Sequence, residues 1–291
     1  MQTNTITLKD NRTLSFAQYG DSKGKPIFLF HGLHSSRLEG VIVSKKMEQK
    51  SIRLIVFDRA GMGQSTFQED RTLFDTVDDT LALAEHLGIE KFSVIGTSSG
   101  AKYALACAYK IPQKLEQVFC LSSGVPTEFV NDDMPKSSRI ALKVLQRFPS
   151  LIKPLFWLSY ARLATKDKDA DMFLGNIIYP LDTIDKNFLF NNSERKESFL
   201  RQCQESYAQG VRGNAYDARF DILKNAWGFD AKDIKFPHIA FYHGSKDLGC
   251  PLSMTKEFVK EIDGAVLHEV DGEGHLTTIF SVIDEVLKKI C

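Results

Sequence analysis

The feature of this sequence that most constrains its fold is a series of short, continuous apolar runs that alternate with segments of helical periodicity. The first runs along the chain are Ile27–Phe30, Ile52–Phe57, Phe92–Ile95 and Val118–Leu121. Runs of this length without polar alternation are typical of strands buried on both faces of a parallel sheet. Between them, Thr72–His86 repeats apolar residues at helical spacing, and Ser98–Lys110 is small and apolar enough to be a buried helix. The alternation predicts a parallel sheet with helices on both faces.

The two ends of the chain extend this sheet, and the middle interrupts it. At the start of the chain, Thr5–Leu8 and Leu14–Tyr19 predict a hairpin. From about residue 126 to residue 233 there is no strong strand signal, and the predicted helices are Arg139–Phe148, Leu151–Ala164, Asp167–Leu174 and Glu194–Gln209. The alternation then resumes with Ile239–His243, Leu252–Glu261, Val266–Val270 and Leu276–Lys289. We predict an α/β core of residues 1–125 and 234–291, with a helical insertion at 126–233.

Composition limits the partners and the cellular compartment that we expect for this chain. The chain has 291 residues, of which 43% are hydrophobic, so it can bury a sizeable core. Its 37 Lys and Arg balance 37 Asp and Glu, so we expect no nucleic-acid partner. No uncharged apolar run approaches the ~20 residues needed to cross a bilayer, and the first residues do not read as a secretory signal. The five cysteines are scattered and odd in number, which favours a reducing compartment. We therefore expect a cytoplasmic monomer or homodimer without a membrane partner.

The strongest local signal for chemistry is the G-x-S-x-G run at residues 96–100, between a predicted strand and a predicted helix. This context is typical of a nucleophile elbow, a turn so tight that side chains on either side of the central residue would collide. Gly96 and Gly100 avoid the collision and expose the hydroxyl of Ser98 above the sheet. The next helix directs its N-terminus at Ser98, which favours negative charge there. We predict that Ser98 is a nucleophile. Ser99 is a rival hydroxyl, and a glycine-rich turn without chemistry is the alternative interpretation.

A serine nucleophile requires a base, and the base requires an acid that orients it. His275 lies in a glycine-rich loop after the last predicted strand, where ligand chemistry gathers in open parallel sheets. Asp247 occupies the equivalent loop one strand earlier, and Glu128 is a fallback acid. The chain order Ser98, Asp247, His275 matches that of one fold class. We predict these residues as catalytic, with a rate that falls on the acid side of about pH 6–7 as the histidine is protonated. A surface histidine and an ordinary turn aspartate are the alternatives.

The oxyanion that forms on a substrate carbonyl needs two backbone N–H donors. We expect one N–H from Ser99 and the other from Leu33, which lies in the loop after the predicted strand Ile27–Phe30. Gly32 lets this loop bend, and we expect Gly32, His31 and His34 to border the substrate pocket. The spacing of His31 and His34 would allow both to bind one metal ion, but no third ligand lies nearby in the sequence. The pair therefore does not indicate a metal site. We therefore predict no metal and no cofactor.

Together these residues resemble the α/β-hydrolase fold superfamily. The resemblance rests on the His31-Gly32 loop, Asp58-Arg59-x-Gly61-x-Gly63-x-Ser65, the elbow at Ser98, the acid loop His243-Gly244-x-x-Asp247, and Gly274-His275. It implies a mostly parallel eight-stranded sheet flanked by helices, with a helical cap inserted after the sixth strand. Phe30-His31-Gly32 with Ser36-Arg37, and Trp227-Gly228-Phe229-Asp230 with Asp233-Ile234, resemble soluble bacterial hydrolases of mostly unassigned substrate. One departure is that many relatives carry Pro and Gly in the oxyanion loop where His34 and Ser35 stand, which alters the acyl-side pocket.

Comparison with neighbouring families narrows the expected reaction. Haloalkane dehalogenases and epoxide hydrolases of this fold use aspartate at the elbow, so Ser98 argues against both. Cofactor-free haloperoxidases usually have Trp or Met after the nucleophile, and Ser99 does not match them. Proline iminopeptidases carry Gly-Gly-Pro-Gly in the oxyanion loop and acidic residues in the cap. The first of these features is missing here, so a peptidase is less favoured.

The predicted cap contains a stretch, Ile140–Ala164, in which aromatic and aliphatic residues alternate with basic ones. Three interpretations stay open: packing on the core, lining an apolar pocket, or resting on a membrane as a basic amphipathic helix. The overall prediction is a serine hydrolase that cleaves an ester-type bond of a small, partly apolar molecule through an acyl-enzyme. The alternatives are a C–C bond hydrolase or acyltransferase with the same triad, and a ligand-binding or signalling protein with little turnover.

Overall fold

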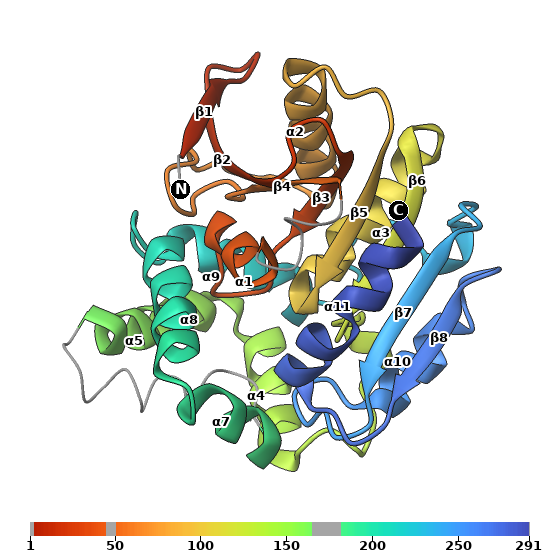
Figure 1. Cartoon of the computed structure of the whole chain (residues 1–291). Coiled ribbons are helices and arrows are strands. Elements are labelled where there is room, and N and C mark those ends of the chain that lie inside the picture. The colour runs from red at the N-terminus through yellow and green to blue at the C-terminus, as the bar shows by residue number, and fades with distance from the viewer. Residues whose placement is uncertain (1–2, 45–50, 165–181, 291) are drawn as a thin grey trace.

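The computed structural model describes residues 3–44, 51–164 and 182–290, and the statements below concern those residues. At its centre lies one sheet of eight strands in the order β1-β2-β4-β3-β5-β6-β7-β8 (Figure 1). The strands are β1 (Asn4–Thr7), β2 (Thr13–Gly20), β3 (Lys25–Phe30), β4 (Ile52–Phe57), β5 (Phe92–Thr97), β6 (Leu115–Leu121), β7 (Ile239–Gly244) and β8 (Val266–Val270). Strand β2 runs antiparallel to β1 and β4, and the remaining pairs are parallel. The predicted hairpin and the mostly parallel sheet are confirmed.

Helices cover both faces of the sheet because its central strands are apolar on both sides. In β3, Phe28 and Phe30 belong to one hydrophobic cluster, whereas Ile27 and Leu29 belong to another. This is the two-residue period of a strand, which sends successive side chains to opposite faces. The helices on the first face are α2 (Leu73–His86), α3 (Ala101–Lys110) and α10 (Leu252–Val259). Those on the second face are α1 (Gly40–Ser44) and α11 (His275–Ile290).

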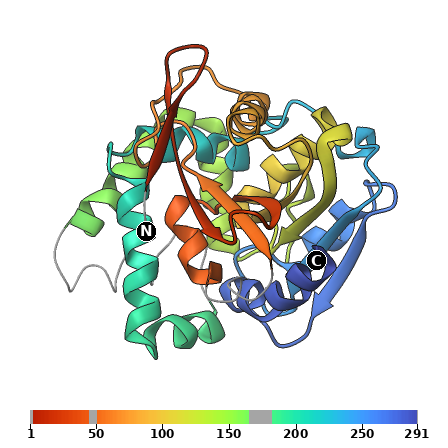
Figure 2. The same ribbon diagram turned by 45° about the horizontal axis from the view of Figure 1, so that its top comes forward.

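Between β6 and β7 the described residues form helices, turns and loops without a strand. The helices are α4 (Lys136–Arg147), α5 (Ile152–Ala164), α7 (Thr183–Phe190), α8 (Ser193–Ser206) and α9 (Arg212–Ile222). Figures 1 and 2 show α8 between α1 and α5, with α7 at the end of α8. Helices α7 and α9 were not predicted from the sequence, and the predicted helix Asp167–Leu174 lies outside the described residues.

The helices of this block have a hydrophobic cluster of their own. Its buried members are Leu145, Ile152, Phe156, Cys203, Tyr207, Val211, Ala215, Ala218 and Ile222. They come from α4, α5, α8 and α9 and the turns between them, so the block is held together by packing as well as by its connections to the sheet. Within the described ranges, no helix combines the length and apolar content needed to cross a membrane.

Candidate active site

The turn between β5 and α3 has the geometry of a strained elbow. Ser98 has a φ of +52°, a left-handed conformation that is uncommon for residues other than glycine. The glycines on either side are required by close backbone approaches. A Cβ on Gly96 would lie 2.5 Å from the Cα of Ala101, and one on Gly100 would lie 2.0 Å from the carbonyl oxygen of Phe30. The two glycines therefore let the turn close and present the hydroxyl of Ser98 at the end of the strand.

Three side chains that are far apart in the sequence form a hydrogen-bonded chain at this elbow. The Nε2 of His275 lies 2.8 Å from the Oγ of Ser98, and its Nδ1 lies 2.7 Å from the Oδ2 of Asp247. Ser98 follows β5, Asp247 follows β7, and His275 begins α11 after β8. Because the carboxyl ends of parallel strands meet at one edge of a sheet, the fold brings these loops together. The three side chains therefore lie in the order expected of a nucleophile, a base and an orienting acid.

The carboxylate of Asp247 is buried and held ionised by its partners. Burial alone would raise its pKa, but the charge of His275 and hydrogen bonds from His243 and His275 lower the pKa well below its usual range. Its Oδ1 also accepts the backbone N–H of Cys250 at 2.8 Å. The second histidine, His243, lies with its Nε2 3.2 Å from the Oδ2 of Asp247. The acid therefore stays charged and fixed beside the imidazole of His275.

The base is held in place through its backbone as well as its ring. The carboxylate of Asp185, in α7, accepts hydrogen bonds from the backbone N–H groups of His275 and Leu276 at 2.7 and 2.9 Å. It also accepts from Thr277 at 3.0 Å, so it caps the N-terminus of α11. The hydroxyl of Ser122 donates to the carbonyl of His275 at 2.7 Å. These contacts fix the first turn of α11, and with it the imidazole.

The pKa of His275 reflects this acidic surrounding. Burial would lower the pKa, but the charge and hydrogen bond of Asp247 raise it, and the charges of Asp185 and Asp182 add to this effect. The net result is a pKa above the ordinary value of 6.5. The imidazole is thus a stronger base than a free histidine.

The loop that follows β3 passes directly over the elbow. A Cβ on Gly32 would lie 3.5 Å from the Cβ of Ser98, so the loop approaches the predicted nucleophile closely. The N–H of Gly32 donates to the carboxylate of Glu39 at 3.0 Å, and the hydroxyl of Thr97 donates to the same group. Glu39 therefore ties this loop to the last residue of β5. This brings the backbone of Leu33 and Ser99, the two expected oxyanion donors, to the same region.

Helix α9 holds both of these segments through two buried aspartates. Asp217 accepts from the Nη2 of Arg59 at 2.9 Å, and the guanidinium of Arg59 donates to the carbonyls of His31 and Gly32. One turn later, Asp221 accepts from the hydroxyl of Ser99 at 2.6 Å. Its charge is balanced by Lys102, whose Nζ lies 2.8 Å away. Carboxylates at i and i+4 lie on the same face of a helix, so one face of α9 reaches both expected oxyanion segments. Sequence reasoning did not identify this contribution.

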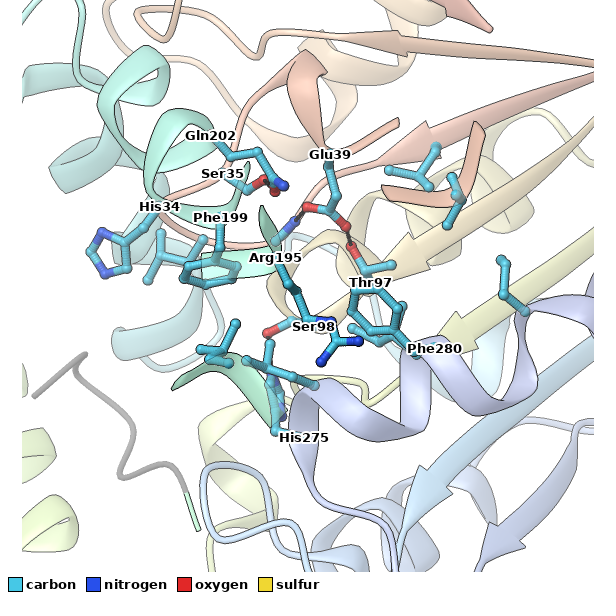
Figure 3. A pocket seen from close by; sticks show the side chains of 18 residues that line it. His34, Ser35, Glu39, Thr97, Ser98, Arg195, Phe199, Gln202, His275 and Phe280 are labelled. Carbon is cyan, nitrogen blue, oxygen red and sulfur yellow. Dashed lines mark hydrogen bonds between the residues drawn. The ribbon is translucent and has the colours of Figure 1, made fainter. Parts of the chain in front are cut away.

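A narrow, mainly apolar cavity opens at Ser98 and His275 (Figure 3). Its lining residues include Leu33, Leu189, Phe199, Leu276, Ile279 and Phe280. The helices that contribute to it from the block between β6 and β7 are α7 and α8. Arg195 of α8 also lines the cavity and places a guanidinium group there.

The remaining residues predicted for the site are distributed as follows. Gly32 and His34 line the cavity, and His34 stacks on Phe156 and Tyr207. Burial lowers the pKa of His34 to about 4, so it is neutral. His31 is fully buried, with its Nδ1 2.9 Å from the carbonyl of Gly32, and does not line the cavity. Glu128 is exposed and accepts the backbone N–H of Asn225, so it is Asp247 and not Glu128 that reaches the base.

The stretch Ile140–Ala164 contributes packing and exposed surface. Ile152 and Phe156 are buried, whereas Phe148 and Trp157 are more than half exposed, at 52% and 58%. Among its described side chains, none lines the cavity at Ser98. The described ranges also contain no group of three or more His, Cys, Asp or Glu side chains placed to hold a metal ion.

Comparisons with known proteins agree with this architecture. Residues 25–281 match the family model described as alpha/beta hydrolase fold. A proline iminopeptidase of Xanthomonas citri is 33% identical over 110 residues, which are 37% of this chain and 35% of that protein. A Mycoplasma pneumoniae protein, provisionally named for the same activity, is 30% identical over 94% of this chain and 92% of its own length.

Among solved structures, a bromoperoxidase of Bacillus anthracis superposes with a TM-score of 0.70 at 18% identity, covering 99% of both chains. Identity this low shows the shared fold and does not extend to the reaction.

Proposed function

The chain belongs to the alpha/beta hydrolase fold family, and from that premise we propose that it is a serine hydrolase that cleaves ester-type bonds through an acyl-enzyme. The observation that carries the proposal is the hydrogen-bonded chain from Ser98 Oγ through His275 to Asp247, at 2.8 and 2.7 Å. The strained elbow and the raised pKa of His275 both support it, because a catalytic hydroxyl has to be exposed and its base has to be strong.

In the proposed reaction, the Oγ of Ser98 attacks the ester carbonyl carbon while His275 takes the hydroxyl proton. The negative charge that develops on the carbonyl oxygen is stabilised by the backbone N–H groups of Leu33 and Ser99. The bond to the leaving alcohol then breaks, and His275 gives its proton to that alcohol. A water molecule, deprotonated by His275, attacks the acyl-enzyme. The bond between the acyl carbon and the Oγ of Ser98 then breaks, His275 returns the proton to that oxygen, and the acid is released. Asp247 holds the imidazole tautomer and balances its charge in both halves.

We further propose that residues 126–233 act as a cap over this site, as expected from the sequence. Leu189, Arg195 and Phe199, from α7 and α8, line the cavity beside Ser98, which supports this division. The apolar lining supports a substrate with a small apolar portion.

A second candidate is a proline iminopeptidase, which is favoured by the names of the relatives. Such an enzyme has to bind the free amino group of its substrate. Among the described residues, the acidic side chain that lines the cavity is Glu39, and it is already engaged by Gly32 and Thr97. The basic Arg195 would repel an ammonium group in the same cavity. These contacts favour the esterase.

The test is a comparison of purified wild-type protein with the Ser98→Ala and Ser99→Ala variants on nitrophenyl esters of short acids and on proline naphthylamide. We expect ester turnover by the wild type, loss of that turnover in Ser98→Ala, and retention in Ser99→Ala, which keeps its backbone N–H. Faster cleavage of the proline amide than of every ester would replace the esterase with the peptidase. Ester turnover by Ser98→Ala at the wild-type rate would contradict the assigned nucleophile.

A further inference from the structure

The cavity beside Ser98 contains a positive charge that the proposed ester chemistry does not use. Arg195 lies in the first turns of α8, and its side chain lines the cavity together with Ser98 and His275. Figure 3 shows the guanidinium of Arg195 in the part of the cavity where Ser98, His275 and Phe280 lie. Most of the other lining side chains are apolar.

Among the described residues, the contacts that orient the guanidinium of Arg195 include no carboxylate. Its Nη1 donates to the backbone carbonyl of Phe188 at 2.5 Å, and its Cζ lies 3.6 Å from the centre of the Phe188 ring. A second ring, that of Phe280, has its centre 5.8 Å from the Cζ. Within the described part of the chain, Arg195 forms no ion pair, and the Phe188 carbonyl is the acceptor of its one side-chain hydrogen bond. A guanidinium has five N–H donors, so several remain for another partner.

Two carboxylates of the site, those of Glu39 and Asp185, are already engaged by hydrogen-bond donors. Glu39, which lines the same cavity, accepts from the backbone of Gly32 and the hydroxyl of Thr97. Asp185 accepts from three backbone N–H groups of α11. Arg195 is half-buried, and a charge that is partly removed from water is stabilised when an opposite charge pairs with it. An anionic group on the molecule that enters the cavity is therefore well placed to pair with the guanidinium of Arg195.

We propose that Arg195 binds a carboxylate on the substrate, so that the preferred substrate is an ester with an apolar spacer between its scissile carbonyl and an anionic end. This inference rests on the proposed function, because it names the substrate class of the same site. The planar fork of arginine matches the two oxygens of a carboxylate, and stacking on Phe188 holds the fork in one plane. The apolar side chains around Ser98 would contact the spacer.

The experiment compares matched nitrophenyl esters that differ only in the terminal group of the acyl chain. One series consists of nitrophenyl monoesters of dicarboxylic acids with increasing chain length, and the other consists of the corresponding methyl-terminated esters. A parallel pair, phenyl and carboxyphenyl esters of one acid, places the anion on the alcohol side. The variants are Arg195→Gln and Arg195→Lys. The control is Arg201→Gln, which removes a cation from the exposed face of the same helix, where Arg201 pairs with Glu197.

We expect the wild type to prefer an anionic ester in one of the pairs. In Arg195→Gln, the ratio of kcat/KM for the anionic ester to that for the neutral ester should fall by about tenfold or more, the scale of a charged hydrogen bond. Arg195→Lys should keep part of the preference, and Arg201→Gln should keep all of it. Simple dicarboxylates should inhibit the wild type competitively, and salt should weaken this inhibition.

Two results would overturn the inference while leaving the proposed function intact. One is turnover of neutral esters at Ser98 without preference for an anion in any pair. The other is a preference for the anionic ester that is as large in Arg195→Gln and Arg195→Lys as in the wild type. If the variants do not fold, absence of salt-sensitive dicarboxylate inhibition in the wild type would overturn the inference as well. Failure of the esterase proposal would differ from all of these, because no ester would then be cleaved at Ser98.

Discussion

The carboxylate of Asp185 lies 2.7 Å from the backbone nitrogen of His275, a residue 90 positions further along the chain. Helix caps are usually supplied by the residue just before the helix, but here α11 is capped by a side chain from α7. Gly274 makes this possible, since a Cβ there would lie 2.8 Å from the Cγ of Asp185. The proposed cap and the proposed base are therefore linked by a direct contact.

We predict that Asp185→Asn changes both stability and pH dependence. The variant loses a charged cap at the N-terminus of α11, so the free energy of unfolding should fall by about 1–2 kcal/mol. The charge of Asp185 raises the pKa of His275, so its removal should move the acid limb of the kcat/KM profile to lower pH. Denaturant unfolding and a pH–rate profile measure the two effects. Asp133→Asn, at an exposed position, is the control. An acid limb at the wild-type pH would mean that Asp185 acts on folding alone.

The raised pKa of His275 refines the pH dependence expected from the sequence. The base has to be neutral to accept the proton of Ser98, so activity is lost as the pH falls through the pKa of His275. Because Asp247 raises that pKa above 6.5, the midpoint of the acid limb should lie above 6.5. The profile of kcat/KM on a neutral ester measures this midpoint. A midpoint below 6.5 would show that burial outweighs the carboxylate.

Replacement of Asp247 by asparagine should leave the fold intact and remove most of the activity. The amide no longer balances the charge of the imidazolium and favours the wrong tautomer, so kcat should fall by about 10⁴. His243 lies 3.2 Å from the same carboxylate oxygen and offers no negative charge to compensate. Steady-state kinetics with a circular-dichroism check of folding measure the effect. Retention of more than a tenth of the wild-type kcat would assign the orienting role to another acid.

The predicted site residues that the structure brings together have local signatures in the sequence. The elbow at Ser98 is marked by two glycines whose role is a backbone contact, and Gly274-His275 follows the last strand. Their meeting with Asp247 follows from the parallel sheet alone, because loops at the carboxyl ends of its strands share one edge. For this reason the fold class could be predicted from the sequence, and the three side chains could be proposed to meet at one edge of the sheet.

The parts that were missed depend on contacts between distant segments. Asp185, Arg195 and Asp217 lie in helices whose sequences resemble ordinary amphipathic or polar surface segments. Their partners are 90 or more residues away, or are aromatic rings, and no spacing rule predicts such pairs. The aromatic stretch before residue 164 was one candidate for the pocket lining, whereas the described side chains of the block that line the cavity come from α7 and α8. Residue type alone did not indicate which helix of the block approaches Ser98.

The buried charged cluster of Asp217, Arg59 and Arg71 gives a stability prediction. Asp217 is fully buried and pairs with Arg59 and Arg71 at 2.9 and 3.2 Å. Asp217→Asn would leave these guanidinium groups buried without their anion, so the free energy of unfolding should fall by about 3–5 kcal/mol. Urea denaturation measures this change. The exposed Asp230→Asn, which loses only a surface ion pair with Lys232, is the matched control. A loss no larger than that of the control would show that the cluster contributes little.

The same cluster has a defined pH dependence. Burial alone would raise the pKa of Asp217, but the charges of Arg59, Lys102 and Arg71 lower it far below the ordinary 3.8. A carboxylate with a lowered folded-state pKa stabilises the protein fully above its unfolded-state pKa, and this contribution is lost as the pH falls below 3.8 toward the folded-state value. The difference in unfolding free energy between wild type and Asp217→Asn should therefore be constant from about pH 5 to neutral pH, and should shrink below about pH 4. A difference that grows under acid conditions would contradict this account.

The central claim is that the hydroxyl of Ser98, activated by His275, forms a covalent bond with the substrate. Its most direct test is to treat the protein with a fluorophosphonate, which phosphonylates activated serines, and to map the adduct by peptide mass spectrometry. We predict one adduct per chain on Ser98, formed much more slowly in His275→Ala and absent in Ser98→Ala. An adduct on Ser99 or elsewhere, or ester turnover that continues while Ser98 stays unmodified, would contradict the account.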